Sequence, residues 1–167
     1  MPALEQDLFR CFRELGIEIT NYRHPPLFSV TESQDLRGEI PGGHCKSLFL
    51  KDKKGQYLLV VMLENRTLDM VGLFKSGLLP IRRLSFASAQ AMTAVLGVTP
   101  GAVTPFSLIN ARPENLLVVL DRQMMDHDLL NYHPLHNEAT TTIRSADLMK
   151  FICHFGFDPL VIDFDKL

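Results

Sequence analysis

The chain has 167 residues, of which 46% are hydrophobic and 22% charged, and its formal net charge is −2. That length suits one domain with a core that needs no disulfides, and the apolar content excludes bulk disorder. No run of about 18 uncharged apolar residues occurs, so we expect no membrane span. The charged N-terminus lacks the apolar segment of a signal peptide, and the 3 cysteines are widely spaced. We therefore expect a cytoplasmic protein in a reducing compartment.

The charges are unevenly distributed along the chain. Residues 44–83 carry 8 Lys and Arg against 3 Asp and Glu, whereas residues 114–167 carry 4 against 9. A local basic region in an acidic protein can hold a polyanion on one face. The simpler alternative is that Lys51, Lys53 and Lys54 only solvate a turn.

The first half of the chain reads as alternating helices and strands. Apolar spacing and turn residues predict a helix over 4–15 that ends at Gly16, a strand over 17–22, a capped helix over 29–36, a loop over 38–43, a hairpin of strands 46–50 and 57–63, a helix capped by Thr67, and a strand over 82–86. The proline pair at 25–26 ends the first strand, because proline cannot donate to a ladder.

The second half of the chain also mixes helices and strands. Its capping residues and apolar runs predict a helix capped by Ser88 that ends at Gly97, a loop over 99–105, strands over 116–120, 129–133 and 139–143, a helix capped by Ser145 that ends at Gly156, and a strand over 160–162. Helices interleaved with hairpin-like strand pairs predict an α+β fold. We expect a single domain over 1–167 with a mixed, twisted β-sheet flanked by helices.

Common enzyme motifs are absent from the sequence. There is no GxGxxG, GxxxxGK[ST], HExxH or GxSxG. Three other segments could carry the chemistry.

The first segment is a glycine loop, 41–43, that runs directly into a strand carrying Lys46. Because strand side chains alternate between faces, Lys46 shares a face with Leu48 and Leu50. A lysine on an apolar face calls for an anionic partner, unless it extends to solvent from the strand end.

The second segment is the loop from Gly101 to Phe106, in which glycine permits close approach of a ligand to main-chain N–H groups. The alternative for this loop is an ordinary turn.

The third segment is the polar turn 131–142, where His133 or His136 could donate or accept a proton. The turn does not place both imidazoles on one face, so we expect no metal there, and no cofactor elsewhere. A Cys45–His44 nucleophilic pair is disfavoured, because neighbours on a strand point opposite ways.

Five segments together resemble the YbaK and prolyl-tRNA-synthetase editing-domain family, in its free-standing branch that deacylates Ala-tRNA(Pro). They are HPPLFSVTES (24–33), PGGHCKSLFLKDKKG (41–55), RLSFAS (83–88), GVTPGAVTPFSLIN (97–110) and YHPLHNEATTTI (132–143). The resemblance covers nearly the whole chain. It implies a trans-acting hydrolase that cleaves the aminoacyl ester at the 3′ end of a mischarged tRNA, and it allows contact with prolyl-tRNA synthetase.

The resemblance also implies roles for individual residues. Lys46 matches the family's lysine, which positions the ester or the terminal phosphate and is not a nucleophile. His133 and Asn137 match residues that line the aminoacyl pocket. Cys45 stands where the family has threonine. The substrate-binding loop matches Gly101, Ala102, Val103, Thr104, Pro105 and Phe106, and the basic positions that hold the acceptor stem match Lys51 with Arg82 or Arg83.

Three other functions remain open from the sequence. The enzyme could act on another small aminoacyl group, such as serine or cysteine. The domain could bind tRNA or a synthetase without catalysis, or it could bind a small molecule and no RNA. Among these, only RNA binding weakens strongly with salt.

Overall fold

The computed structural model describes residues 1–26 and 40–167. The predicted helix over 29–36 lies outside these residues. The strands are Ile19–Arg23 (β1), Gly43–Asp52 (β2), Tyr57–Leu63 (β3), Leu84–Phe86 (β4), Leu116–Asp121 (β5), Leu129–Tyr132 (β6), Ala139–Arg144 (β7) and Leu160–Ile162 (β8). The helices are Glu5–Glu14 (α1), Met70–Lys75 (α3), Ala89–Leu96 (α4), Arg122–Met125 (α5) and Ser145–His154 (α6), with 3-10 turns at Pro105–Asn110 (η1), Pro113–Asn115 (η2) and Phe164–Lys166 (η3).

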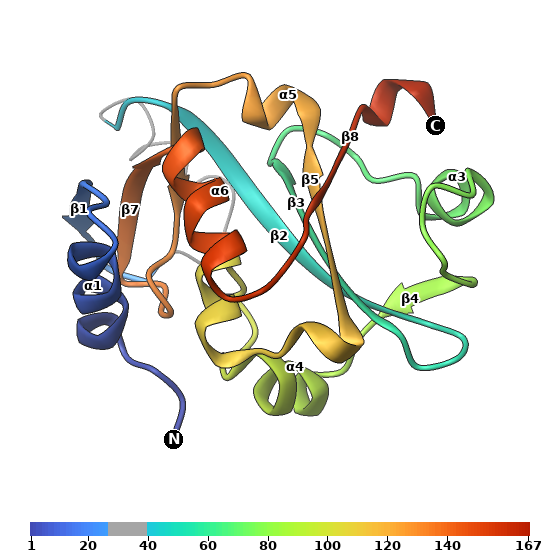
Figure 1. Ribbon diagram of the computed structural model, residues 1–167, viewed down its shortest axis with the longest axis horizontal. Helices are drawn as coiled ribbons and strands as arrows, with labels where there is room; N and C mark the ends of the chain where they lie inside the picture. Colours follow the sequence, from blue (N-terminus) through green and yellow to red (C-terminus); the bar gives the residue numbers. More distant parts are fainter. Residues whose placement is uncertain (27–39) are drawn as a thin grey trace.

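The strands form a single mixed sheet in the order β1-β7-β6-β2-β3-β5-β8, with β4 paired to β2 (Figure 1). The β2–β3, β2–β4, β6–β7 and β1–β7 pairs are antiparallel, whereas β2–β6, β3–β5 and β5–β8 are parallel. The α+β fold and its mixed sheet are therefore confirmed. No helix in the described part of the chain has the length and apolar character needed to cross a membrane.

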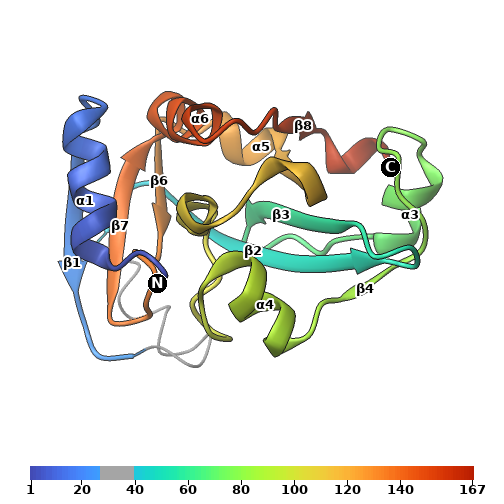
Figure 2. The ribbon, with the colours of Figure 1, turned by 60° about the horizontal axis from the view of Figure 1, so that its bottom comes forward.

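Both faces of the long strand β2 pack against apolar side chains. Phe49 belongs to the core cluster that includes Phe12 of α1 and Phe151 of α6. Leu50 belongs to the opposite cluster, under α3. Figures 1 and 2 show α1 and α6 at one end of the sheet and α3 at the other. Apolar side chains therefore cover β2 on both sides, so the apolar character predicted for the Lys46 face is shared by the opposite face.

The β2–β3 hairpin follows its predicted turn, and a buried carboxylate fixes it. The Asp52 carboxylate accepts hydrogen bonds from the main-chain N–H groups of Lys54 at 2.9 Å and Gln56 at 2.8 Å. Its other oxygen accepts from the N–H of Arg82 at 2.9 Å. A single side chain thus closes the hairpin and holds the segment that leads into β4, which places Arg82 and Lys51 at the same end of the molecule.

The helices begin and end close to the predicted residues, except that two N-caps differ and one short helix was not predicted. Ser88 accepts from the N–H of Ala91 at 3.0 Å, and Gly97 ends α4 with φ of 69°, as predicted. The Thr67 cap is wrong, because Asp69 fills this position and accepts from Gly72. The Ser145 cap is also wrong. This residue is the first of α6, and its N–H donates to the carbonyl of Asp128. The unpredicted helix α5 is capped by the Asp121 side chain.

Candidate functional site

A cavity of about 390 Å³ lies along the middle of β2. Its volume falls within the usual range for small-molecule sites. It is lined by polar His44, Lys46, Ser47, Glu64, Asn131, His133 and Thr140 and by apolar or nearly apolar Ile40, Cys45, Leu48, Phe49, Phe86, Ala87, Met92, Pro100, Gly101, Val103 and Tyr132. Mostly apolar walls with a few convergent polar groups are typical of a binding site.

The cavity unites the three segments singled out in the sequence. Lys46 comes from β2, Gly101 and Val103 come from the glycine–proline loop, and His133 follows β6. These residues lie far apart in the chain, yet they line the same space. Sheet order explains this, because the parallel pairing of β2 with β6 brings the start of β2 beside Asn131.

The rest of the predicted loop supports the cavity without lining it. Ala102, Thr104, Pro105 and Phe106 are buried in the protein interior. The Thr104 hydroxyl accepts from the N–H of Phe106 at 3.3 Å and starts η1. Phe106 packs edge-on against Phe12, Tyr132 and Phe151. These residues therefore anchor the loop in the core, and only Gly101 and Val103 face the cavity.

The other predicted site residues lie outside the cavity lining. Asn137 is half-buried, and its amide nitrogen is 3.8 Å from where a Cβ on Gly101 would stand. It is thus a neighbour of the glycine–proline loop. Lys51, Arg82 and Arg83 are exposed at the far end of β2 and beside β4. The structure separates them from Lys46 along the strand.

One edge of β2 is left without a strand neighbour where it meets the cavity. Among the described residues, β6 pairs with Gly43 and His44, and β4 pairs from Leu50 onward. The His44 carbonyl accepts from the N–H of Glu64, so it faces β3. Because main-chain groups alternate along a strand, the N–H and carbonyl of Ser47 face the opposite edge. These main-chain groups are placed to hydrogen-bond a bound molecule.

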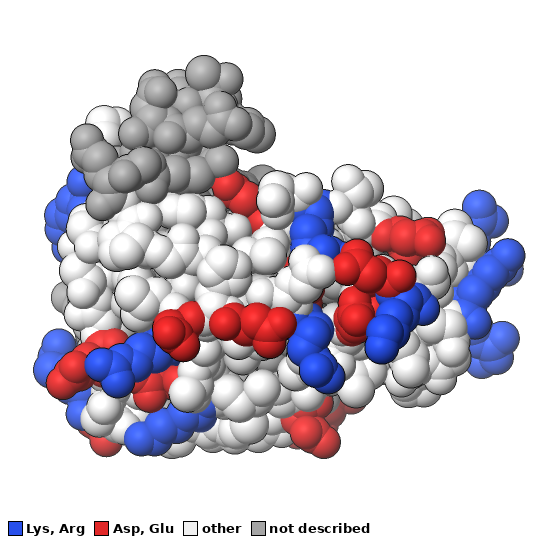
Figure 3. Space-filling model, turned by 90° about the horizontal axis from the view of Figure 1, so that it is seen from above, with Lys and Arg blue, Asp and Glu red and all other residues white. Residues whose placement is uncertain are grey.

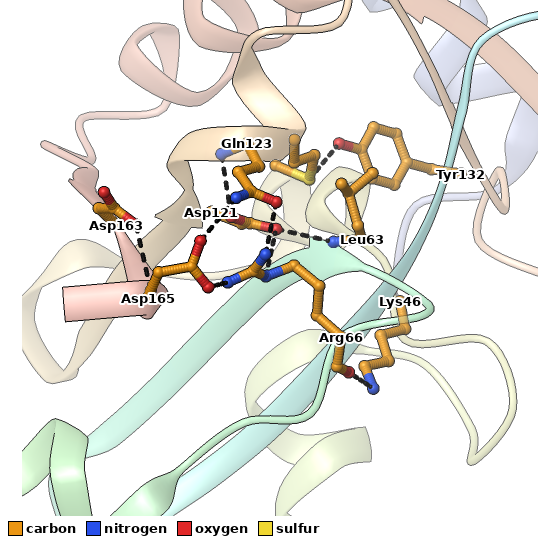
Figure 4. A network of polar contacts seen from close by, with 9 residues as sticks. Lys46, Leu63, Arg66, Asp121, Gln123, Tyr132, Asp163 and Asp165 are labelled. Carbon is orange, nitrogen blue, oxygen red and sulfur yellow. Dashed lines mark hydrogen bonds and ion pairs between the residues drawn. The ribbon is translucent and has the colours of Figure 1, made fainter. Parts of the chain in front are cut away.

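Lys46 is half-buried and makes one contact that the sequence did not predict. Its ammonium group donates to the main-chain carbonyl of Arg66 (Figure 4). A carbonyl carries only a partial negative charge, so the ammonium keeps its positive charge available to an anionic or developing oxyanionic group. The contact fixes the cation at the cavity wall.

His133 is held in one tautomer by the turn after β6. Its Nδ1 lies 3.0 Å from the carbonyl of Ala139, and a carbonyl can only accept, so Nδ1 carries the proton. Burial lowers the pKa of His133, and nearby His24 and His136 lower it further against the effect of that hydrogen bond. The imidazole is therefore neutral at pH 7, with Nε2 as an acceptor.

His133 and His136 serve different partners. His136 Nε2 lies 3.1 Å from a carboxylate oxygen of Glu5 on α1. Within residues 1–26 and 40–167, no group of three or more His, Cys, Asp or Glu side chains is arranged to hold a metal ion. The pair acts as two separate hydrogen-bonding groups in this part of the chain.

Asn131 is a buried residue whose role sequence reasoning missed. Its amide nitrogen donates to the carbonyls of Pro41 at 2.9 Å and Gly43 at 3.2 Å, and its oxygen accepts from the Thr142 hydroxyl at 2.5 Å. It therefore ties the glycine loop before β2 to β6 and β7. The available signal was a polar residue within an otherwise apolar strand.

Phe86 was also missed as a site residue. It lies at the end of β4, lines the cavity, and is 64% exposed. A large aromatic side chain left in contact with water beside a cavity is suited to stacking on a planar ligand group. Its place in a strand was predictable from the sequence, whereas its exposure was not.

The environment of Cys45 disfavours a role as nucleophile. Its sulfur lies 3.6 Å from the Gly43 carbonyl, and burial raises its pKa to about 12. We predict that an alkylating reagent at pH 8 labels the exposed Cys153 well before Cys45, because burial keeps the Cys45 thiol protonated at that pH. Peptide mass spectrometry over time measures both rates. Equal rates would show that Cys45 is accessible and ionised.

A family model and two named relatives match most of this chain. A model of the aminoacyl-tRNA editing domain matches residues 24–151. The prolyl-tRNA synthetase associated domain-containing protein 1 of Bos taurus is 34% identical over 167 residues, covering 98% of this chain and 95% of the relative. The prolyl-tRNA editing protein ProX of Acetoanaerobium sticklandii is 32% identical over 140 residues, covering 83% and 84%.

Solved structures share the fold. The crystal structure of a candidate trans-editing enzyme for prolyl tRNA synthetase aligns with a TM-score of 0.65 at 16% identity and covers 98% of each chain. The crystal structure of a hypothetical protein aligns with a TM-score of 0.71 at 18% identity, covering 93% of this chain and 97% of the other. The five segments of the sequence and the matched residues agree, and the chain belongs to the aminoacyl-tRNA editing domain family.

Proposed function

We propose that this protein is a trans-acting aminoacyl-tRNA deacylase that hydrolyses the ester of mischarged Ala-tRNA(Pro). Membership of the editing-domain family supports the class of reaction. The similarity to a relative named as a prolyl-tRNA editing protein supports proline tRNA as the adaptor. The observation that carries the proposal is that Lys46, Gly101 and His133 line one cavity.

Hydrolysis of the aminoacyl ester requires few catalytic side chains. A water oxygen attacks the ester carbonyl carbon, the bond from that carbon to the ribose oxygen breaks, and the ribose oxygen takes a proton from the water. The ammonium of Lys46 and the main-chain donors on the β2 edge and the Gly101 loop stabilise the developing oxyanion. Gly101 has φ of 90°, so a residue with a Cβ would strain this loop.

Two acceptors could take the proton from water in this arrangement. One is the neutral Nε2 of His133, and the other is the ribose 2′-hydroxyl of the substrate itself, as the family resemblance implies. Discrimination comes from size, because a synthetic site for proline cannot reject the smaller alanine by more than roughly 1–3 kcal/mol. A separate cavity that admits alanine and excludes the proline ring corrects this error.

An exposed basic surface supports tRNA as the partner. Lys51, Lys53, Lys54, Arg82 and Arg83 are exposed at the β2–β3 turn and before β4. In Figure 3, Lys and Arg side chains project from the end of the molecule that carries α3 and this turn in Figure 1, with acidic side chains farther inward. Phosphates of the acceptor stem would follow β2 from this surface to the cavity.

The decisive test is a deacylation panel with purified protein. We expect rapid hydrolysis of Ala-tRNA(Pro), and at most slow hydrolysis of Pro-tRNA(Pro), when release of the labelled amino acid is followed over time. Faster hydrolysis of a seryl or cysteinyl ester would assign the enzyme to that cargo instead.

Binding without turnover would indicate a different function. If the protein binds charged tRNA but releases no amino acid in a single-turnover assay, it is a binding module for tRNA or a synthetase. Affinity for tRNA that does not fall as salt rises would contradict the role given to the basic surface.

A further inference from the structure

Lys46 takes its position from a residue in another part of the chain. Its ammonium contacts the main-chain carbonyl of Arg66, which lies in the turn that follows β3. That turn is closed by a hydrogen bond of 3.2 Å from the Arg66 N–H to the Leu63 carbonyl. The direction of the carbonyl, and with it the place of the ammonium, depends on how firmly this turn is held.

The Arg66 side chain anchors the turn on the opposite side. Its guanidinium donates to Asp165 at 2.6 Å and to the Gln123 side-chain oxygen, and its Nε lies 3.7 Å from an oxygen of Asp121. The Arg66 side chain is only 17% exposed. In Figure 4 the guanidinium points to Gln123 and Asp165, while the carbonyl of the same residue points to Lys46.

The partners of Arg66 are themselves fixed. Asp121 is fully buried and accepts from the N–H of Leu63 at 3.1 Å and from the N–H of Gln123 at 3.0 Å. The Gln123 side chain also donates to Asp165 at 2.7 Å, which closes a ring with Arg66. The end of β3, the start of α5 and the C-terminal turn η3 therefore meet at one guanidinium.

We propose that Arg66 is a positioning residue for the deacylation, acting through its main-chain carbonyl on the ammonium of Lys46. This inference rests on the proposed function. The carboxylates of Asp121 and Asp165 neutralise the guanidinium, so its role differs from that of the exposed lysines and arginines that face the tRNA. Because a small misplacement of a reacting group can cost roughly 100-fold in rate, loosening the turn should reduce turnover more than binding.

The test compares Arg66→Met with Arg66→Lys. We expect Arg66→Met to lower kcat roughly 10- to 100-fold with little change in KM for tRNA. Arg66→Lys should recover only part of the loss, because an ammonium cannot reach three partners as a planar guanidinium does. Arg23→Met, which removes the 2.8 Å Arg23–Glu5 ion pair on β1, is the matched control and should leave kcat unchanged.

A second variant distinguishes loss of positioning from unfolding of the protein. Asp165 has a side chain that is 59% exposed, so Asp165→Asn removes one anchor without leaving a buried charge unpaired. We expect a smaller fall in kcat, with a circular dichroism spectrum like that of the natural protein. If kcat is unchanged in both Arg66→Met and Asp165→Asn while both remain folded, the positioning role is wrong.

A double-mutant cycle separates positioning from general support. If Arg66 acts through Lys46, Arg66→Met should cause no further loss in a Lys46→Ala background, whereas independent losses would multiply. The ¹⁵N resonance of the Lys46 ammonium reports on the same contact without any activity. A shift in Arg66→Met supports the inference, and an unchanged resonance overturns it. A loss in Lys46→Ala without any effect of Arg66 variants would reject this inference and leave the proposed function intact.

Discussion

Replacement of Lys46 with alanine is expected to lower kcat for Ala-tRNA(Pro) about 10²–10³-fold. This is the loss measured when one preorganised donor to a developing oxyanion is removed. Lys46 is the cation among the described cavity-lining residues, and its ammonium is fixed by the Arg66 carbonyl. Single-turnover release of labelled alanine measures the effect directly.

Two other lysines provide controls for this result. Lys150 on α6 also donates its ammonium to a main-chain carbonyl, that of Leu15, away from the cavity. Lys150→Ala should therefore leave both kcat and KM unchanged. Lys51→Ala should leave kcat unchanged but raise KM and reduce the salt dependence of tRNA binding, because Lys51 is exposed on the basic surface proposed to hold the tRNA. Undiminished turnover in Lys46→Ala would reject the catalytic role of this lysine.

Gly42→Ala is expected to cause the largest loss of stability. Gly42 has φ of 102°, and a Cβ there would lie 2.7 Å from the main-chain oxygen of Leu129. The left-handed backbone costs a residue with a side chain about 1–2 kcal/mol. Overpacking against a backbone atom that cannot rotate away adds about 1–3 kcal/mol. Urea unfolding followed by circular dichroism measures the sum.

Gly55→Ala separates these two contributions. Gly55 in the β2–β3 turn has φ of 92°, but no atom lies within 4 Å of the point where its Cβ would stand. Gly55→Ala should therefore lower the free energy of unfolding only by the cost of the left-handed backbone, about 1–2 kcal/mol. Equal losses in the two variants would show that β6 moves away from Gly42 at no cost. Because Gly42 precedes β2 and contacts β6, its replacement should also reduce deacylation by disturbing the cavity.

Local sequence signals predicted most of the secondary structure. The β2–β3 hairpin follows from two apolar runs around a turn that contains Gly55, and α4 follows from Ser88 and Gly97. These features depend on residues close together in the chain, whose conformational preferences act locally. The missed helix α5 is only four residues long, and its cap, Asp121, sits at the end of an apolar strand.

The site could be predicted as three segments but not as a cavity. Lys46, the Gly101 loop and the His133 turn were each identified from residue types and from the family resemblance. Which loop residues face the cavity was not predictable, because Ala102 and Phe106 are turned into the core by the packing of η1 against α1 and α6. The exposure of Phe86 likewise depends on β4 lying at an edge of the sheet.

The sequence by itself determined most of the helices and strands, the family, and the three segments that could carry the chemistry. The tertiary structure alone decided that Lys46 meets the carbonyl of Arg66 and that Asp121, Gln123 and Asp165 hold that residue in place. Capping and turn preferences act over a few residues, and the sequence displays them. Contacts between residues about 20 to 100 positions apart depend on the sheet order, which the packing of the whole chain sets.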